Sequence, residues 1–416
     1  IKTFTLTINN TSSSTLNYVT WYSTTSSNVL TGVKLSNADS SSPSGSITSG
    51  SSKVIYVQIR NEGSEEIDAT IGISSSAGSI VLSNSMTQVG SEELYYTLAE
   101  HITNLYTSAE KSTATQSITY NVASSVGLMN DRLGSSSTDI DGGNIRYYGA
   151  YPNNYIYFNC SDYSNQSFST CELWRIIGVF DGKVKIMRNE VIGEYSWDNK
   201  DTTTGAEDDS GKNDWTDARL MKLLNPGYES ETTGGSLYYN SISGSCYSGK
   251  NNATVSCDFT STGIKNDTTR NLISDTLYYL GGWNGSSVYS NRIYGYERGT
   301  IVYSGRPTSW IGKIALPYPS DYGYAAYLGS CTQTLNNYDN STCTSTNWMK
   351  SIFANNSWLL TPHSSGSNFA WYVISSGGVS FNSSTGDGNV VPVLYLGSEQ
   401  GIESGTGTSS DPYKLS

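Results

Sequence analysis

Charged side chains and histidine are scarce in this chain of 416 residues. Charged residues make up 14% of it, well under the roughly 25% that is typical of soluble domains. Asp and Glu outnumber Lys and Arg, and the formal net charge is −12. This charge argues against binding to nucleic acid or to anionic membrane surfaces, which need clustered basic residues. No apolar run approaches the roughly 20 residues of a membrane span. The chain begins at Ile1 without a signal-peptide pattern, so we expect processing, with any anchor outside this sequence.

Ser, Thr, Asn and Gly take the place of the missing charges, and the 32 tyrosines outnumber Phe and Trp together. This composition favours β-structure with many turns. We therefore expect an α+β or mostly β protein of three parts: an immunoglobulin-like β-sandwich over residues 1–89, a helical connector and linker over 90–143, and a larger domain over 144–416.

The six cysteines form three close pairs, each spanning a short loop rich in Asn, Ser and Thr. None belongs to a CxxC motif, and zinc sites built from thiols need closer spacing and nearby histidines. We expect three local disulfides, each stabilising the fold by about 3 kcal/mol in the loop-entropy model; reduced, buried cysteines are the alternative. Disulfides would place the protein in an oxidising, extracellular setting. The pairs are Cys160 with Cys171, Cys246 with Cys257, and Cys331 with Cys343.

The first 89 residues carry the alternation of apolar and polar residues that is typical of strands with one buried face. Phe4, Leu6 and Ile8 alternate with Thr, and turn-forming clusters separate the runs. Short strands with regular turns and no helix favour an immunoglobulin-like β-sandwich. The stretch VIYVQIRNEGSEEIDATIGI is interpreted as a hairpin that turns at Asn61–Ser64.

A helical period begins after Ser91, which is placed to cap the helix. Leu94, Leu98, Ile102 and Leu105 recur at helical spacing. His101 lies inside this helix and is expected to pack or to face solvent. A second, weaker helical pattern covers 117–133, and GSSSTDIDGGN then has the composition of a linker.

The remaining residues alternate between strand and helix patterns without a fixed repeat. We expect a two-residue turn at Asp181-Gly182. The expected strands are Ile156–Phe158, Leu173–Val179 and Lys183–Arg188, and the expected helices are Thr216–Leu224, capped by Thr216, and Asn271–Leu280.

Three blocks of this last part have a characteristic order. They are CELWRIIGVFDGKVKIMRNE, then WDNK…NDWTDARLMKLLNPGYE, and finally WLLTPHSSGSNFAW…VVPVLYL. In this order and spacing the region Ile145–Leu396 resembles C-type-lectin-like surface proteins of bacteria and phages, including the variable proteins of diversity-generating retroelements. The related closing motif usually carries an Arg before the proline, where it would form a structural ion pair, whereas this chain has Val391.

The resemblance implies a closing segment in which a fixed framework alternates with exposed, variable positions that contact a ligand. Adenine-directed mutagenesis of Asn codons yields a mixture of residues like the one found here, although surface loops are commonly rich in Ser and Asn as well. The implied framework is Trp358, Leu359, Leu360, Pro362, Phe369, Trp371, Val373, Gly377, Val391, Pro392 and Leu394. The implied ligand-binding positions are His363, Ser364, Ser365, Ser367, Asn368, Tyr372, Ser375, Ser380, Phe381, Asn382, Asp387 and Asn389.

We do not expect an enzyme, because the chemistry-bearing residues fall in no specific motif. A Ser-His-Asp triad would have to use His363, in a loop expected to be exposed. Acids available for glycoside hydrolysis are interpreted as solvated surface residues; they are Glu190, Glu194, Asp198, Asp217 and Asp321.

No cofactor or resident metal is expected. Calcium is the one metal with candidate oxygen ligands, but the sugar-binding signatures Glu-Pro-Asn and Gln-Pro-Asp do not occur, and we interpret the candidates as turns. They are Asp198, Asn199 and Asp201, or Asp387 with Asn389.

Two functional hypotheses follow. The first is an extracellular adhesin or receptor-binding protein whose lectin-like head recognises a protein or glycan on another cell or host surface. Tyrosines near turns would add contact area; they are Tyr147, Tyr148, Tyr238, Tyr239, Tyr289 and Tyr294. The second is a subunit of a surface filament or layer that exchanges its first strand, IKTFTLTI, between copies.

Overall fold

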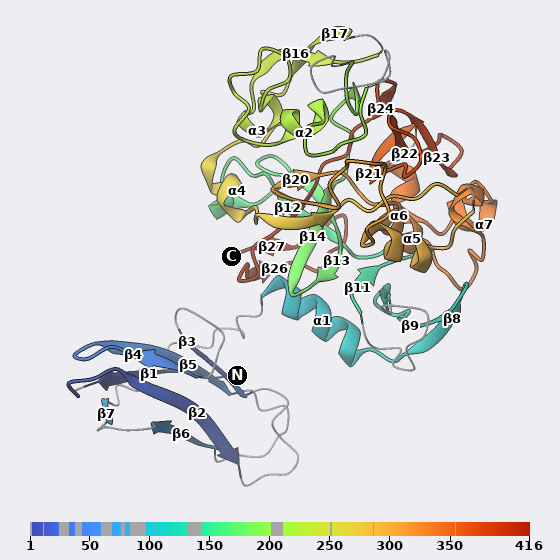
Figure 1. Cartoon of the computed structure of the whole chain (residues 1–416). Coiled ribbons are helices and arrows are strands. Elements are labelled where there is room, and N and C mark those ends of the chain that lie inside the picture. The colour runs from blue at the N-terminus through green and yellow to red at the C-terminus, as the bar shows by residue number, and fades with distance from the viewer. Residues whose placement is uncertain are drawn as a thin grey trace. The chain divides into compact units, whose positions relative to one another are not determined.

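The computed structural model describes residues 2–10, 12–24, 33–37, 44–59, 69–75, 80–83, 97–131, 143–200, 211–249, 252–285, 287–353 and 355–416. The chain divides into two compact units, Ile1–Tyr95 and Tyr96–Ser416. Strands predominate in both units and helices are few (Figure 1). The expectation of a mostly β protein is confirmed.

The first unit contains two antiparallel sheets. One has the order β3-β5-β1-β7 and the other β4-β2-β6. Leu16 of β2 lies opposite Ile47 of β4, and both side chains are buried. The strands are β1 (Lys2–Asn10), β2 (Leu16–Thr24), β3 (Val33–Asn37), β4 (Ser44–Ile47), β5 (Ser52–Ile59), β6 (Ala69–Ser75) and β7 (Ile80–Ser83).

Strand pairing in the first unit corrects one prediction. The expected hairpin does not form, because β5 pairs with β1 and β3 whereas β6 pairs with β2 in the other sheet. The turn proposed at Asn61–Ser64 lies outside the described residues. Strand β1, which the filament hypothesis would exchange, pairs with β5 of its own chain from Lys2 to Asn9.

The second unit begins with helix α1 (Leu98–Ser108). Thr97 caps it: the Thr97 hydroxyl accepts a hydrogen bond from the Glu100 amide at 3.2 Å, and the Glu100 carboxylate accepts one from the Thr97 amide at 3.0 Å, the reciprocal arrangement of a capping box. Ser91, the expected cap, lies outside the described residues. His101 contacts the Tyr413 ring edge-on at 5.3 Å, and partial burial lowers its pKa.

The helix expected over 117–133 is wrong, because the described part of this segment, up to residue 131, forms strands and turns. Tyr120 and Val122 are buried while Thr119 and Asn121 are half-buried, which is the two-residue period of a strand. Antiparallel pairing with neighbouring strands decides the outcome. The strands concerned are β8 (Ser112–Thr115), β9 (Thr119–Ala123) and β10 (Leu128–Asn130).

Two sheets organise the rest of the second unit. A nine-stranded sheet has the order β20-β25-β14-β13-β11-β10-β9-β8, with β12 also pairing with β13. Its other members are β11 (Ile145–Tyr147), β12 (Tyr155–Phe158), β13 (Glu172–Phe180), β14 (Lys183–Arg188), β20 (Ile314–Ala315) and β25 (Val393–Tyr395). A five-stranded sheet has the order β15-β24-β21-β22-β23. Its members are β15 (Glu194–Ser196), β21 (Ser357–Pro362), β22 (Phe369–Val373), β23 (Val379–Ser383) and β24 (Asp387–Asn389).

Three two-stranded sheets and several short helices complete the unit. The sheets are β16 (Ser243–Tyr247) with β17 (Thr254–Asp258), β18 (Thr276–Tyr279) with β19 (Ser309–Gly312), and β26 (Ile402–Ser404) with β27 (Lys414–Leu415). The helices are α2 (Arg219–Leu224), α3 (Leu237–Asn240), α4 (Asp267–Leu272), α5 (Ser290–Glu297), α6 (Pro319–Tyr324) and α7 (Ser341–Thr344), with 3₁₀ turns η1 (Tyr163–Asn165), η3 (Leu335–Asn337) and η4 (Trp348–Ser351).

The central strands β13 and β14 are buried along almost their whole length, as expected for strands covered on both faces. The three strands predicted in this region are confirmed as β12, β13 and β14. Asp181 and Gly182 have φ of 48° and 75°, so the two-residue turn that joins β13 to β14 is left-handed at both positions, as a tight hairpin requires.

Both helices predicted in this region need correction. Helix α2 begins at Arg219, because Thr216 bonds backward to the Asp214 carboxylate and does not cap the helix. The segment Asn271–Leu280 is the end of α4 followed by strand β18, whose four residues pair with β19. Cross-strand pairing with β19 therefore determines the structure of the second half of this segment.

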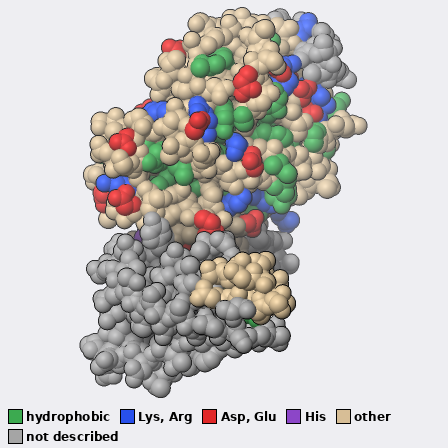
Figure 2. All heavy atoms as spheres, turned by 90° about the vertical axis from the view of Figure 1, so that its left-hand side faces the viewer, with side chains coloured by type: hydrophobic (Ala, Val, Ile, Leu, Met, Phe, Trp, Pro, Cys, Tyr) green, Lys and Arg blue, Asp and Glu red, His purple; other side chains and the backbone are tan. Residues whose placement is uncertain are grey.

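Charges of the two signs are interspersed on the face of the second unit that Figure 2 presents, with hydrophobic side chains scattered between them.

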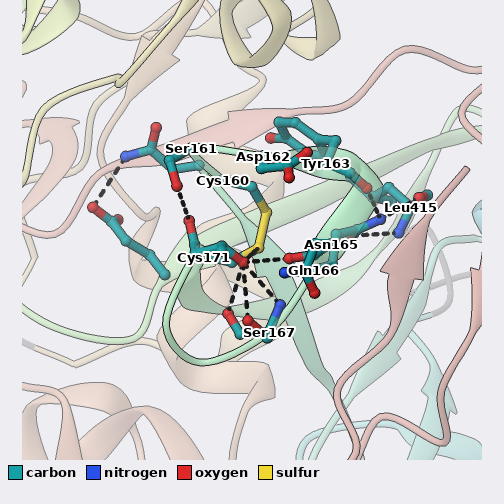
Figure 3. Close-up of a disulfide and its surroundings, with 12 residues drawn as sticks. Cys160, Ser161, Asp162, Tyr163, Asn165, Gln166, Ser167, Cys171 and Leu415 are labelled. Carbon is teal, nitrogen blue, oxygen red and sulfur yellow. Dashed lines mark hydrogen bonds between the residues drawn. A yellow bond between two sulfur atoms is a disulfide. The ribbon is translucent and has the colours of Figure 1, made fainter.

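All six cysteines are paired, and the pairs are the three that the sequence predicts. In the Cys160–Cys171 loop, hydrogen bonds supplement the disulfide: the Ser161 amide donates to the Thr170 carbonyl at 2.7 Å, and the Thr170 hydroxyl donates to the Asn165 carbonyl at 2.5 Å (Figure 3). Three disulfides are compatible with an extracellular protein.

Removing the Cys331–Cys343 disulfide as a double Ala variant should lower the free energy of unfolding by about 3 kcal/mol, since a loop of this length loses its closure constraint in the unfolded chain. Urea titration followed by tryptophan fluorescence measures this. The Cys246–Cys257 pair closes a loop of nearly the same length, with sequence separations of 11 and 12, so its double variant should lose a similar amount. Unequal losses would contradict the loop-closure explanation.

Candidate functional site

The candidate site lies on the five-stranded sheet, around the hairpin of β22 and β23 and the loop that leads into it (Figure 1). Beneath it, ten of the eleven framework positions are buried, and Phe369 is half-buried. The ring nitrogens of two tryptophans are satisfied: Trp358 donates to the Tyr195 carbonyl at 3.0 Å, and Trp371 donates to the Trp283 carbonyl at 3.1 Å. Val391, which replaces the expected Arg, is buried in the main hydrophobic core, so this position is apolar here.

The twelve predicted ligand-binding positions differ in exposure. Exposed positions are Ser365, Ser375, Phe381 and Asp387, and half-buried ones are Ser367, Asn368, Tyr372, Ser380 and Asn382. The remaining three are buried, which corrects the expectation that they are exposed: His363, Ser364 and Asn389.

Each buried position has a local cause. The His363 ring stacks on Trp371 with centroids 5.7 Å apart, and its burial lowers the pKa of His363. The Ser364 amide donates to the Trp283 carbonyl at 3.1 Å, which draws this residue against the core. Asn389 belongs to β24, an interior strand of the five-stranded sheet that lies between β15 and β21.

Strand register divides the predicted positions between two faces. Residues directly opposite each other on paired strands share a face, and neighbours along a strand alternate. Phe381 lies opposite Trp371, whereas Ser380 lies opposite Tyr372 and Asn382 opposite Ala370. Phe381 therefore points away from Tyr372, Ser380 and Asn382. On that other face the Tyr372 ring packs near Trp358, with centroids 5.8 Å apart.

The face that bears Phe381 carries a cluster of rings, here called the aromatic patch: Phe381, Phe369, His363, Trp371 and Trp283. The Phe381 centroid is 4.6 Å from that of His363 and 5.4 Å from those of Phe369 and Trp371. Trp371 in turn stacks on Trp283 at 4.2 Å with planes 22° apart. Phe381 is 42% exposed. Its ring therefore faces solvent while it packs against the buried rings of His363 and Trp371.

Two residues that the sequence did not single out hold the loop from His363 to Phe369. The buried Asn213 amide group donates to three loop carbonyls, those of His363, Gly366 and Phe369, at 2.9, 2.7 and 2.9 Å. Arg306 donates to the Asn213 side-chain oxygen at 3.1 Å and to the Ser367 carbonyl at 2.9 Å. The NDW sequence belongs to one of the three blocks with a characteristic order, but no local pattern predicts that Asn213 binds a loop far away in the sequence.

The candidate calcium ligands have structural partners. The Asp198 carboxylate accepts from the amides of Lys212 and Arg219, which begins α2, and burial raises the pKa of Asp198 to about 7. The Asp387 carboxylate accepts from the Ser248 hydroxyl at 2.8 Å and from the Gly249 amide. Asp201 lies outside the described residues. Within the described ranges, no group of three or more His, Cys, Asp or Glu side chains is placed to hold a metal ion.

The other acidic candidates are dispersed. Asp321 is buried in an ion-pair network with Arg146 and Lys185, which contradicts its interpretation as a solvated acid. Burial contradicts that interpretation for Asp198 as well. Asp217 pairs with Lys222 at 3.0 Å, and Glu194 is exposed on β15. Glu190 lies 3.9 Å from Arg188.

Five of the six tyrosines proposed as contact residues are buried, and Tyr289 is half-buried. The buried ones are Tyr147, Tyr148, Tyr238, Tyr239 and Tyr294.

None of the helices in the described part of the chain has both the length and the apolar character to cross a bilayer. Comparison of the chain with protein-family models, with curated proteins and with solved structures finds no match.

Proposed function

We propose that this protein is an extracellular adhesin or receptor-binding protein. Its first unit is an immunoglobulin-like sandwich, and its second unit is a C-type-lectin-like head that recognises a protein or glycan on another cell or host surface. The order of the three sequence blocks, the β-rich architecture and the three disulfides support this proposal.

The observation that carries the proposal is the exposure of Phe381 on the aromatic patch. A large apolar ring that is 42% exposed loses little conformational freedom on binding when its neighbours already fix it, and such preorganised aromatic anchors dominate many recognition surfaces. Polar side chains border the patch: Ser365 is exposed, and Ser367 and Asn368 are half-buried. An apolar centre with a polar, neutral rim is the usual composition of a binding surface.

The buried stack gives this surface a rigid support. Trp371 is anchored by its ring nitrogen and by stacking on Trp283, and Asn213 holds the adjoining loop by three hydrogen bonds. Substitutions at exposed positions would therefore change which ligand is bound without disturbing the core. A diversified binding face requires this separation.

Replacing Phe381 with Ala is expected to weaken ligand binding by about thirtyfold or more, since removal of a central aromatic anchor typically costs about 2 kcal/mol or more. The melting temperature should stay nearly unchanged, because the ring is already partly in solvent. The ligand is first found by screening the wild-type chain on arrays of immobilised glycans and of extracellular protein domains, and affinities are then measured by surface plasmon resonance.

Ile311→Ala is the matched control, because Ile311 is 69% exposed on β19, outside the patch. It should bind as the wild type does. Tyr372→Ala tests the opposite face of the hairpin and should weaken binding less than Phe381→Ala. Undiminished binding by Phe381→Ala, or equal loss in the Ile311 control, would contradict the proposed site.

A further inference from the structure

A second surface feature of the head lies apart from the aromatic patch. It is a groove of about 500 Å³, within the range of roughly 300–1,000 Å³ that is typical of small-molecule sites. Its walls are the β9–β10 turn, the segment that follows β11, Tyr327 and Thr346. No residue of the Pro362–Asn389 segment lines it, so it is independent of the proposed binding face.

Backbone hydrogen bonds join the walls of this groove to one another. The Tyr148 amide donates to the Gly127 carbonyl at 3.0 Å, and the Gly149 amide donates to the Ala325 carbonyl at 2.9 Å. The Tyr327 amide donates to the Thr346 carbonyl at 3.2 Å. The groove is therefore formed in advance of any ligand, which lowers the entropic cost of binding.

Tyrosine rings line the groove. Tyr151 is 93% exposed, an extreme value for a side chain of this size in a folded unit. Beside it, Tyr148 and Tyr327 stack with centroids 5.5 Å apart and planes 24° apart. Stacking fixes these two rings, while the face of Tyr151 is open to a ligand.

The remaining groups are neutral and suited to hydrogen bonding. The hydroxyls of Tyr148 and Ser124 share a hydrogen bond of 3.2 Å, and Asn153 and Ser125 are exposed at the rim. Among the described residues that line the groove, none carries a carboxylate, an amine or a guanidinium. A phosphate, a sulfated sugar or a charged peptide would find no counter-ion here.

We propose that this groove binds a neutral oligosaccharide, with one pyranose ring stacked on Tyr151. The C–H face of a pyranose is apolar and flat, so it matches an open aromatic ring, while its hydroxyls match the hydroxyl, amide and backbone groups of the walls. The groove is open to solvent, which suits a polar ligand that extends beyond the walls and does not suit a small apolar one. The inference does not depend on the function proposed for the aromatic patch.

Saturation-transfer NMR and isothermal titration on the full chain test this proposal, with cellohexaose, mannohexaose, chitohexaose and galactohexaose as neutral probes and a heparin hexasaccharide as the acidic control. At least one neutral probe should bind, and the heparin probe should not. Tyr151→Ala should weaken binding about tenfold, and Tyr151→Phe should bind nearly as the wild type does, because the ring is kept. Tyr296→Ala is the control for an exposed tyrosine outside the groove.

Failure of all four neutral probes to bind the wild-type chain would overturn the inference, as would full binding by Tyr151→Ala. A probe that binds Tyr151→Ala normally but is lost in Phe381→Ala would assign the sugar to the aromatic patch, which rejects the groove and supports the proposed function. Loss in Tyr151→Ala alone, with unchanged melting temperature, would establish a separate sugar site.

Discussion

Replacing Asp321 with Asn is expected to lower the free energy of unfolding of the second unit by about 3–5 kcal/mol, the usual cost of leaving a buried charge without its partner. Asp321 lies 2.9 Å from Arg146 Nη1 and 2.5 Å from Lys185 Nζ, and all three side chains are 1% exposed. Arg146 has a second partner in Asp131, at 2.6 Å. The substitution leaves Lys185 without its ion-pair partner, since Lys185 pairs with Asp321.

The pH dependence of this loss has a definite sign. Burial alone would raise the pKa of Asp321, but the charges of Lys185 and Arg146 outweigh burial and hold the pKa below its ordinary value. A carboxyl group with a lowered pKa in the folded state stabilises the fold above its unfolded value, about 4, and this contribution disappears as the pH falls through the folded value. The difference between wild type and Asp321→Asn should therefore be full at pH 7 and shrink below about pH 4.

Urea unfolding measured by tryptophan fluorescence reports on this unit, because eight of the nine tryptophans lie beyond Tyr95. Asp275→Asn is the matched control, since Asp275 pairs with Lys313 at 3.4 Å but is 66% exposed, and it should change little. Adding Lys185→Met to Asp321→Asn should recover part of the loss by removing the stranded charge. A small effect of Asp321→Asn at pH 7, or no recovery in the double variant, would contradict this explanation.

Replacing Asn213 with Ala is expected to destabilise the second unit by about 3 kcal/mol and to loosen the loop from His363 to Phe369. The carbonyls of His363 and Gly366 would lose the donor that Asn213 supplies, whereas the Phe369 carbonyl would keep the His363 amide. Unsatisfied buried groups cost about 1–3 kcal/mol each, less what water recovers. Binding through the aromatic patch should weaken as well, because His363 and Phe369 belong to both the loop and the patch.

Hydrogen exchange measures the protection of the loop amides separately from that of the rest of the unit. The amides of His363 and Ser384 donate to the Phe369 and Asn368 carbonyls at 2.9 and 2.7 Å, and both should exchange faster in Asn213→Ala. Asn240→Ala is the control, because the Asn240 amide group donates an exposed hydrogen bond to the Glu229 carboxylate at 3.2 Å. Unchanged exchange at His363 in Asn213→Ala would show that the loop is held by other contacts.

Local sequence patterns predict much of the fold. The spacing of the cysteines predicts their pairing, because each disulfide closes a loop of 11 or 12 residues. Asp181-Gly182 predicts the hairpin of β13 and β14, because both positions need a left-handed backbone. The helix predictions at 117–133 and 271–280 are wrong because antiparallel strand pairing settles the structure there, and local spacing cannot assign β5 and β6 to different sheets.

The sequence by itself determined a β-rich chain with few charged residues and three local disulfides, properties that depend on composition and on short-range spacing. The resemblance to lectin-like proteins implied a framework in the closing segment, and ten of its eleven residues are buried. Only the tertiary structure decided which polar positions face solvent. Strand register places Phe381 and Tyr372 on opposite faces, and stacking on Trp371 buries His363. Asn213 reaches its loop across 150 residues of sequence, a contact that no local pattern encodes.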